Sequence, residues 1–150
     1  MIAVVILNWN GAEMLRRFLP SVVEHSHPLG EVIVADNGST DESLEILQQE
    51  FPEVRTLVLD RNYGFAEGYN EAFRRLEIIA PQRYEYYLLL NSDVRVTADW
   101  LCPLHTYMEQ HPEVAAAQPK LRAEWAHDTL EYAGAAGGYI DRYGYPFCRG

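Results

Sequence analysis

The sequence predicts an α/β fold, in which a mostly parallel sheet is flanked by helices. Short apolar runs alternate with amphipathic helical stretches, and each of four apolar runs leads into a cluster rich in asparagine and aspartate. The length of 150 residues is sufficient, because a domain of this size buries roughly 68–70% of its unfolded surface and can form one solid core. Since strand–helix–strand crossovers are right-handed, helices are expected on both faces of the sheet.

The first strand and the first helix are predicted near the start of the chain. Ala3–Leu7 is apolar and rich in β-branched residues, as expected of a strand that is buried on both faces. Asn10 and Gly11 then supply a turn. The helix that follows ends near His25, and its apolar residues recur at helical spacing: Leu15, Phe18, Leu19, Val22 and Val23.

The next unit is predicted as strand, helix and strand. Val32–Ala35 is a second buried strand. Ser39 and Glu42 have the S-x-x-E spacing of a capping box, which predicts a helix that continues through Gln49. Val54–Leu59 is the third strand.

Two more strands complete the predicted sheet, and two more helices complete the predicted fold. Tyr86–Leu90 is the fourth strand and Val114–Ala117 the fifth. Thr97 is expected to cap a helix that ends before His111 and Pro112. The helix between the third and fourth strands is predicted from four residues at helical spacing: Phe65, Tyr69, Phe73 and Leu76.

Composition and charge restrict the class of partner. The net charge of −10 argues against nucleic acid, whose phosphate backbone is bound by clustered Lys and Arg. Cys102 and Cys148 lack metal-ligand spacing, which predicts neither a disulfide framework nor a zinc site. The apolar start Ile2–Leu7 is too short for a signal peptide, and no run approaches the length of a membrane span. A cytoplasmic protein is therefore expected.

Four polar clusters define the predicted ligand site. Because the carboxyl ends of parallel strands meet at one edge of a sheet, the clusters should converge where open α/β sheets bind ligands. Such a site favours a nucleotide-type ligand with a metal. The phosphate loops G-x-G-x-x-G and G-x-x-x-x-G-K-[ST] are absent from the sequence, which argues against dehydrogenases and P-loop enzymes. The clusters are Asn8-Trp9-Asn10, Asp36-Asn37, Arg61-Asn62 and Asn91-Ser92-Asp93.

In order and spacing, these motifs resemble those of the family 2 inverting glycosyltransferases, which have the GT-A fold. The resemblance covers Ile2 to about Lys120 and is closest to bacterial enzymes that transfer rhamnose or similar sugars to surface polysaccharides. It implies a nucleotide-sugar-binding domain over residues 1–120 and the partly irregular start of an acceptor-side region over 121–150. It also implies transfer from a UDP- or dTDP-type donor to a glycan or lipid-linked acceptor with inversion, at the inner face of the membrane.

The resemblance places the catalytic base, a carboxylate, well downstream of the last motif. The chain is therefore expected to be C-terminally truncated and inactive on its own, and no residue in it is assigned as the base. Two alternatives stay open: a binding-only module that holds the donor without transfer, and a nucleotidyltransferase. Enzymes of the latter class usually carry a phosphate loop rich in Gly, Arg and Lys after the first strand, where this chain has Asn8-Trp9-Asn10-Gly11.

Asp36 and Trp9 have predicted roles at the nucleoside. Asp36 is placed to accept hydrogen bonds from a pyrimidine ring N–H or from ribose hydroxyls, or else it only shapes the turn with Gly38. Asn37 is assigned to that turn. Trp9 would stack on the base, as the aromatic residue at this position does in the resembling family, or else it caps the core beside the helix.

The cluster Asn91-Ser92-Asp93 stands where the family carries its D-x-D motif, and all three residues are assigned to the nucleotide-sugar site. The charge of a diphosphate leaving group must be offset by a divalent cation, and Mg²⁺ or Mn²⁺ accepts carboxylate and phosphate oxygens. Asp93 is the predicted metal ligand. Asn91 departs from the full motif, because it offers a neutral carbonyl oxygen.

Four further residues are assigned to the loops of the nucleotide-sugar site. Asn8 and Asn10 hold the first loop or touch the nucleotide, with a loop role favoured for Asn10. Asn62 and Gly64 turn the third strand into its helix, in the loop that the family uses to border the nucleotide sugar. Gly64 is expected to adopt a positive φ.

The aromatic residues near the end of the chain form the last prediction. They could provide a platform for an acceptor sugar, but an uncovered apolar patch is favoured, and such a patch promotes self-association. These residues are Tyr139, Tyr143, Tyr145 and Phe147.

Overall fold

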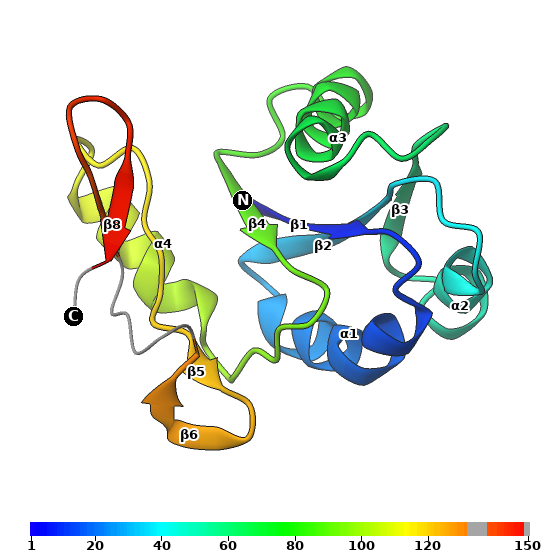
Figure 1. Cartoon of the computed structure of the whole chain (residues 1–150). Coiled ribbons are helices and arrows are strands. Elements are labelled where there is room, and N and C mark those ends of the chain that lie inside the picture. Colours follow the sequence, from blue (N-terminus) through cyan, green and yellow to red (C-terminus); the bar gives the residue numbers. More distant parts are fainter. Residues whose placement is uncertain (132–137, 149–150) are drawn as a thin grey trace. The chain divides into compact units, whose positions relative to one another are not determined.

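The computed structural model describes residues 1–131 and 138–148 (Figure 1). The chain divides into two compact units, Met1–Cys102 and Pro103–Gly150. The boundary predicted at residue 120 lies within the second of these units. Among the described residues, no helix combines the length and the apolar character needed to span a bilayer.

The first unit is built on a four-stranded parallel sheet with the order β3-β2-β1-β4. All four strands coincide with predicted apolar runs to within one or two residues at each end, which confirms the α/β fold with a parallel sheet. The strands are β1 (Ile2–Asn8), β2 (Gly30–Asp36), β3 (Arg55–Val58) and β4 (Tyr86–Leu90).

Helices cover both faces of this sheet, as predicted (Figure 1). Successive side chains of a strand point to opposite faces, so that β1 contributes Val4 to one core and Val5 to the other. A fully buried side chain of this size stabilises the fold by about 1.5–3 kcal/mol relative to an exposed one. On one face lie α1 (Ala12–Ser26) and α2 (Ser43–Glu50), and on the other lies α3 (Phe65–Ile79).

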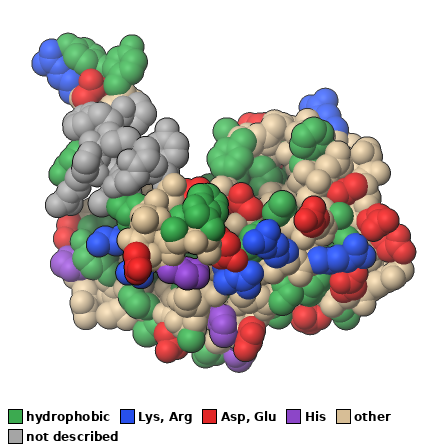
Figure 2. Space-filling model, turned by 60° about the horizontal axis from the view of Figure 1, so that its bottom comes forward, with side chains coloured by type: hydrophobic (Ala, Val, Ile, Leu, Met, Phe, Trp, Pro, Cys, Tyr) green, Lys and Arg blue, Asp and Glu red, His purple; other side chains and the backbone are tan. Residues whose placement is uncertain are grey.

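The outer surface of α1 and α2 carries acidic and basic side chains next to one another (Figure 2). Arg16 of α1 pairs with Glu50 at 2.9 Å and with Glu42 at 3.4 Å. Because these groups are exposed, their pairing contributes little to stability. The two helices are therefore held mainly by the apolar core beneath them, which includes Leu19 and Leu47.

The second unit contains two separate antiparallel pairs. The helix α4 (Leu101–Gln110) begins in the first unit, where Leu101 is buried in the core, and continues into the second. The two pairs are β5 (Arg122–Ala123) with β6 (Ala126–Leu130), and β7 (Gly138–Ile140) with β8 (Pro146–Cys148).

The predicted fifth strand, Val114–Ala117, is wrong. Residues 114–121 pair with no strand in the described structure, and Ala115–Ala117 are exposed. Alanine is depleted in strands because its small side chain packs weakly on a pleated surface. Pro119 also lies two residues after Ala117 and lacks a backbone donor.

Two predicted helix caps are also wrong. Ser39 does not cap α2, which begins at Ser43, because the Ser39 hydroxyl accepts hydrogen bonds from the Asn8 side chain and from the Asn10 backbone. Thr97 does not cap α4, which begins only at Leu101. A turn separates Thr97 from the helix, and Asp99 in this turn has a φ of 56°.

Candidate functional site

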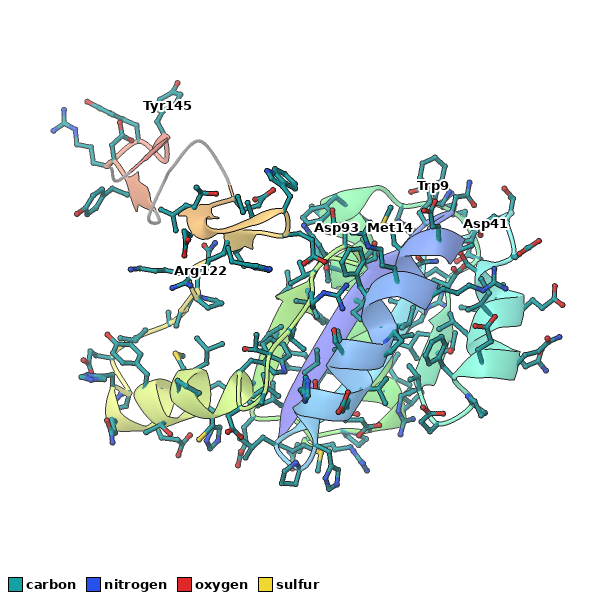
Figure 3. The ribbon with its side chains drawn as sticks, turned by 90° about the horizontal axis from the view of Figure 1, so that it is seen from below. Trp9, Met14, Asp41, Asp93, Arg122 and Tyr145 are labelled. Atoms are coloured by element: carbon teal, nitrogen blue, oxygen red, sulfur yellow. The ribbon has the colours of Figure 1, made fainter. Side chains whose placement is uncertain are left out.

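The carboxyl ends of β1, β2 and β4 meet at one edge of the first unit. In the sheet register, Asn8 lies opposite Asp36, and β4 ends on the other side of β1 just before Asn91. Figure 3 shows Trp9 and Asp93 at this same end. The predicted convergence of the polar clusters is therefore confirmed.

Two glycines show how closely the loops at this edge are packed. A Cβ on Gly11 would lie 2.3 Å from Oδ1 of Asn8 and 3.9 Å from Oγ of Ser92, so the first and fourth clusters are neighbours. A Cβ on Gly38 would lie 2.7 Å from the carbonyl carbon of Arg61, so the second and third clusters are neighbours as well. The position of Gly38 thus requires a residue without a side chain, because the atoms that a Cβ would meet belong to the backbone.

The order in which strands are added to the sheet reverses at β1. The chain runs from β1 outward through β2 to β3, and then places β4 on the opposite side of β1. Open α/β sheets bind their ligands outside the carboxyl ends of the strands at such a reversal. The loops that follow β1 and β4, with residues 8–10 and 91–93, flank this point.

Trp9 projects from the first of these loops and is 56% exposed. The alternative in which Trp9 caps the core is therefore wrong. Behind it, Asn10 adopts a φ of 51°, donates its N–H to Oγ of Ser39 at 2.9 Å and accepts the N–H of Thr40 on Oδ1 at 2.8 Å. Asn10 thus fixes the loop, and the indole of Trp9 is free to stack on a ligand.

Asp36 and Asn8 lie beneath this loop and have no exposed surface. Oδ2 of Asp36 accepts the Asn8 side-chain amide at 3.0 Å, and Oδ1 accepts the N–H of Ser39 at 2.9 Å. In this arrangement the two side chains join the β1–α1 loop to the β2–α2 loop. The contact of Asp36 with a pyrimidine or ribose stays a prediction.

Asp41, which the sequence interpretation passed over, connects the first turns of two helices. Its Oδ2 accepts the N–H of Ala12 in α1 at 3.1 Å, and its Oδ1 accepts the N–H of Ser43 in α2 at 3.0 Å. Burial alone would raise the pKa of Asp41, but the hydrogen bonds from Ser43 and Ala12 lower it overall. The available signal was an aspartate in the first turn of the helix predicted after Ser39, a position where carboxylates satisfy free N–H groups.

Removing this carboxylate should destabilise the protein in a pH-dependent way. Asp41→Ala is expected to lower the free energy of unfolding by about 1–2 kcal/mol at pH 7, as for the loss of a helix cap. Because the folded-state pKa is depressed, the contribution of the charge is present above the ordinary value of 3.8 and is lost as the pH falls through the folded value. Urea unfolding at pH 7 and pH 3 should show a smaller difference from wild type at pH 3, and an equal difference would contradict this role.

Asn37 is assigned from the sequence to the turn with Gly38, but its side chain bonds to a different loop. Its Oδ1 accepts the N–H of Tyr63 at 2.9 Å, and its Nδ2 donates to Oδ1 of Asn62 at 3.1 Å and to the carbonyl of Gly64 at 3.0 Å. Asn37 therefore joins the end of β2 to the loop before α3. Gly64 has a φ of 77°, which confirms the predicted positive φ.

The side chains of Asn91 and Asp93 are exposed, and Ser92 between them is half-buried. The described residues contain no group of three or more His, Cys, Asp or Glu side chains that could hold a metal. A cation at this edge would depend on oxygen atoms of Asp93 and Asn91 and on the ligand. Mg²⁺ is commonly bound in this way, by one or two carboxylates together with substrate phosphates, so the residues present fit a divalent cation.

The four aromatic residues predicted to form a patch near the end of the chain lie on the hairpin formed by β7 and β8. Tyr139, Tyr143 and Tyr145 are exposed, and the guanidinium of Arg142 lies 4.6 Å from the ring centre of Tyr143. The side chain of Phe147 lies outside the described part of the structure. Self-association through this segment stays a prediction.

Comparison of the sequence with known proteins identifies related glycosyltransferases. The family model described as Glycosyl transferase family 2 matches residues 3–144. The N-acetylglucosaminyl-diphospho-decaprenol L-rhamnosyltransferase of Mycobacterium tuberculosis is 27% identical over 124 residues, which are 79% of this chain and 40% of the relative. An uncharacterized glycosyltransferase of Nostoc sp. is 33% identical over 75 residues, which are 48% of this chain and 23% of the relative. The chain spans less than half the length of these relatives.

The fold is also shared with solved structures. The structure of S. aureus TarS 1–349 in complex with UDP-GlcNAc matches with a TM-score of 0.60 and 22% identity, over 74% of this chain and 32% of that chain. The mannosyltransferase PcManGT from Pyrobaculum calidifontis, in complex with GDP-Man and Mn²⁺, matches with a TM-score of 0.59 and 20% identity, over 81% of this chain and 33% of that chain. At these identities the likeness concerns the fold, and it confirms the predicted GT-A type.

Proposed function

The chain belongs to glycosyl transferase family 2, and from this membership we propose that it binds the donor of an enzyme that transfers a sugar to a glycan or lipid-linked acceptor with inversion. The observation that carries the proposal is that the polar clusters meet at the edge of the parallel sheet where the strand order reverses. An exposed aromatic ring, Trp9, and an exposed carboxylate, Asp93, are presented there. The base of a nucleoside diphosphate can stack on Trp9, and its phosphates can interact with Asp93 through a cation.

The donor that we propose is a nucleoside-diphosphate sugar of the UDP or dTDP type. Of the two structures that share the fold, TarS is in complex with UDP-GlcNAc and PcManGT with GDP-Man, so the fold alone does not select the base. The preference for a pyrimidine here rests on the resemblance of the motifs around Trp9 and Asp36. Titration with UDP, dTDP and GDP in Mn²⁺ tests it, and tightest binding of GDP would contradict it.

The proposed site also includes a divalent cation, Mg²⁺ or Mn²⁺. Asp93 would hold it, with the Asn91 carbonyl oxygen as a second ligand, and when bound it would supply positive charge that offsets the departing diphosphate. The complex of PcManGT with Mn²⁺ and GDP-Man supports the use of a divalent cation. With a net charge of −10, the protein offers little other compensation for an anionic ligand.

In the proposed transfer, the acceptor hydroxyl attacks the anomeric carbon on the side opposite the nucleoside diphosphate. The configuration at that carbon is thereby inverted, and a general base removes the proton of the hydroxyl. We assign this base to no residue of the chain. A lipid-linked acceptor is supported by the name of the M. tuberculosis relative, which includes a diphospho-decaprenol, and a location at the inner face of the membrane stays a prediction.

Loss of the Trp9 ring is expected to weaken donor binding. Stacking on an aromatic side chain is worth roughly 1–3 kcal/mol per base, so Trp9→Ala should raise the Kd for UDP in Mn²⁺ about tenfold or more, whereas Trp9→Phe should retain most of the affinity. Calorimetric titration measures both. Ile78→Ala is the control, because Ile78 is 74% exposed in the same unit, near the end of α3 that is remote from the loop of residues 62–64, and should not affect binding. Equal affinity of Trp9→Ala and wild type would remove Trp9 from the site.

A further inference from the structure

One buried amide, that of Asn37, makes all of its side-chain hydrogen bonds to a single loop. The residue is 2% exposed, and its three partners are consecutive residues between β3 and α3: Asn62, Tyr63 and Gly64. Its own N–H donates to the carbonyl of Asn8 at 2.7 Å, which anchors Asn37 to β1. The loop before α3 is therefore tied to the centre of the sheet through one side chain.

The chemistry of these bonds requires an amide at position 37. The carbonyl of Gly64 can only accept, and the N–H of Tyr63 can only donate, so the side chain must offer a donor on one side and an acceptor on the other. Oδ1 of Asn62 also accepts the N–H of Gly64 at 2.7 Å, which fixes which end of that side chain faces Asn37. An aspartate at position 37 would have the same shape but would direct an oxygen at two acceptors.

We propose that Asn37 is a positioning residue for the donor site: it holds the loop of residues 62–64 in the shape that receives the nucleotide sugar. This inference rests on the proposed function. Asn62 and Gly64 are exposed, so this loop presents part of its surface to solvent while Asn37 holds it from below. The same bonds stabilise the φ of 77° at Gly64, the residue that precedes the first turn of α3.

The loop geometry can be tested without any ligand, by amide hydrogen exchange. Asn37→Ala removes the acceptor of the Tyr63 N–H, so the exchange rate of this amide should rise about tenfold or more. Asn70→Ala is the matched control, because Asn70 is an exposed asparagine on α3 whose side chain contacts only Glu67 at 3.4 Å. Unchanged exchange at Tyr63 in Asn37→Ala would overturn the inference.

Binding provides the second measurement. At a temperature where circular dichroism shows each variant to be folded, Asn37→Ala and Asn37→Asp should both bind UDP in Mn²⁺ about tenfold more weakly than wild type, and Asn70→Ala should bind normally. A role in stability alone would lower the melting temperature but leave the Kd of the folded protein unchanged, and that result would overturn the inference. If Asn37→Ala does not fold, Asn37→Asp carries the test, because it keeps the acceptor of the Tyr63 N–H and loses the two bonds that the amide donates, and it is expected to give the same loss of affinity.

The two proposals fail in different ways. Absence of binding of both UDP and dTDP by the wild-type chain would overturn the proposed function and, with it, the role of Asn37. Wild-type binding that neither Asn37→Ala nor Asn37→Asp weakens would overturn the role of Asn37 alone. Weaker binding by Asn37→Ala with unchanged exchange at Tyr63 would point to a direct contact with the ligand and would also overturn positioning.

Discussion

Gly38→Ala is expected to lower the free energy of unfolding by about 3 kcal/mol or more, whereas Gly64→Ala should cost less, about 1–3 kcal/mol. Both glycines have a positive φ, 74° and 77°, and Gly64 has a ψ of −168°, a combination that is strained for any residue with a side chain. Their surroundings differ. A Cβ on Gly38 would lie 2.7 Å from the carbonyl carbon and 2.9 Å from the Cα of Arg61, whereas a Cβ on Gly64 would meet nothing within 4 Å.

The pair therefore separates backbone strain from steric collision. Both variants carry the strain of a side chain at positive φ, and only Gly38→Ala also forces two backbone segments apart, since the atoms that it meets cannot rotate away as a side chain could. Urea denaturation measures both costs. Equal destabilisation by the two substitutions would show that the loops after β2 and β3 are not in close contact. Gly38→Ala should also weaken UDP binding, because relief of the collision displaces the loop before α3.

The sheet could be predicted from the sequence because its strands are buried on both faces. Val4 and Val5 point to opposite faces, yet neither is exposed, so the strand is an uninterrupted apolar run and needs no alternating pattern to be found. Once four such runs are taken as parallel strands, the residues that follow them must meet at one edge. That Asn8 and Ser92 lie at the same edge thus follows from strand geometry, whereas their proximity also depends on the pairing of β4 with β1, which the apolar runs did not reveal.

The hydrogen bonds between loops could not be predicted in this way. The side chain of Asn37 bonds to partners at least 25 positions away, and one oxygen of Asp41 reaches a partner 29 positions away. No periodic pattern links such positions, because these bonds depend on where neighbouring loops come to lie. The same reason explains the failed capping box. The spacing of Ser39 and Glu42 is visible in the sequence, but the hydrogen bond from the Asn10 N–H to the Ser39 hydroxyl is not.

Asp93→Asn is expected to weaken UDP binding in Mn²⁺ at least about 100-fold, or about 2.7 kcal/mol. Asp93 is the one carboxylate in the segment Asn91-Ser92-Asp93, so the substitution leaves only neutral oxygen atoms there. Asparagine keeps the shape of the side chain, and the loss would therefore report on charge rather than packing. Asp99→Asn is the matched control, since Asp99 is exposed in the same connection and its φ of 56° is one that asparagine also adopts readily.

The role of the cation is decided by repeating the titrations after Mn²⁺ is removed with a chelator. If Asp93 acts by holding the metal, removal of Mn²⁺ should weaken UDP binding by wild type by about the same factor as the substitution does. It should leave the affinity of Asp93→Asn almost unchanged, because both changes abolish the same interaction. If metal removal weakens wild type and Asp93→Asn equally, the two effects are independent, and the cation is held elsewhere. In that case the carboxylate would not be its ligand, and the metal assignment would have to be abandoned even though the donor site at this edge of the sheet could stand.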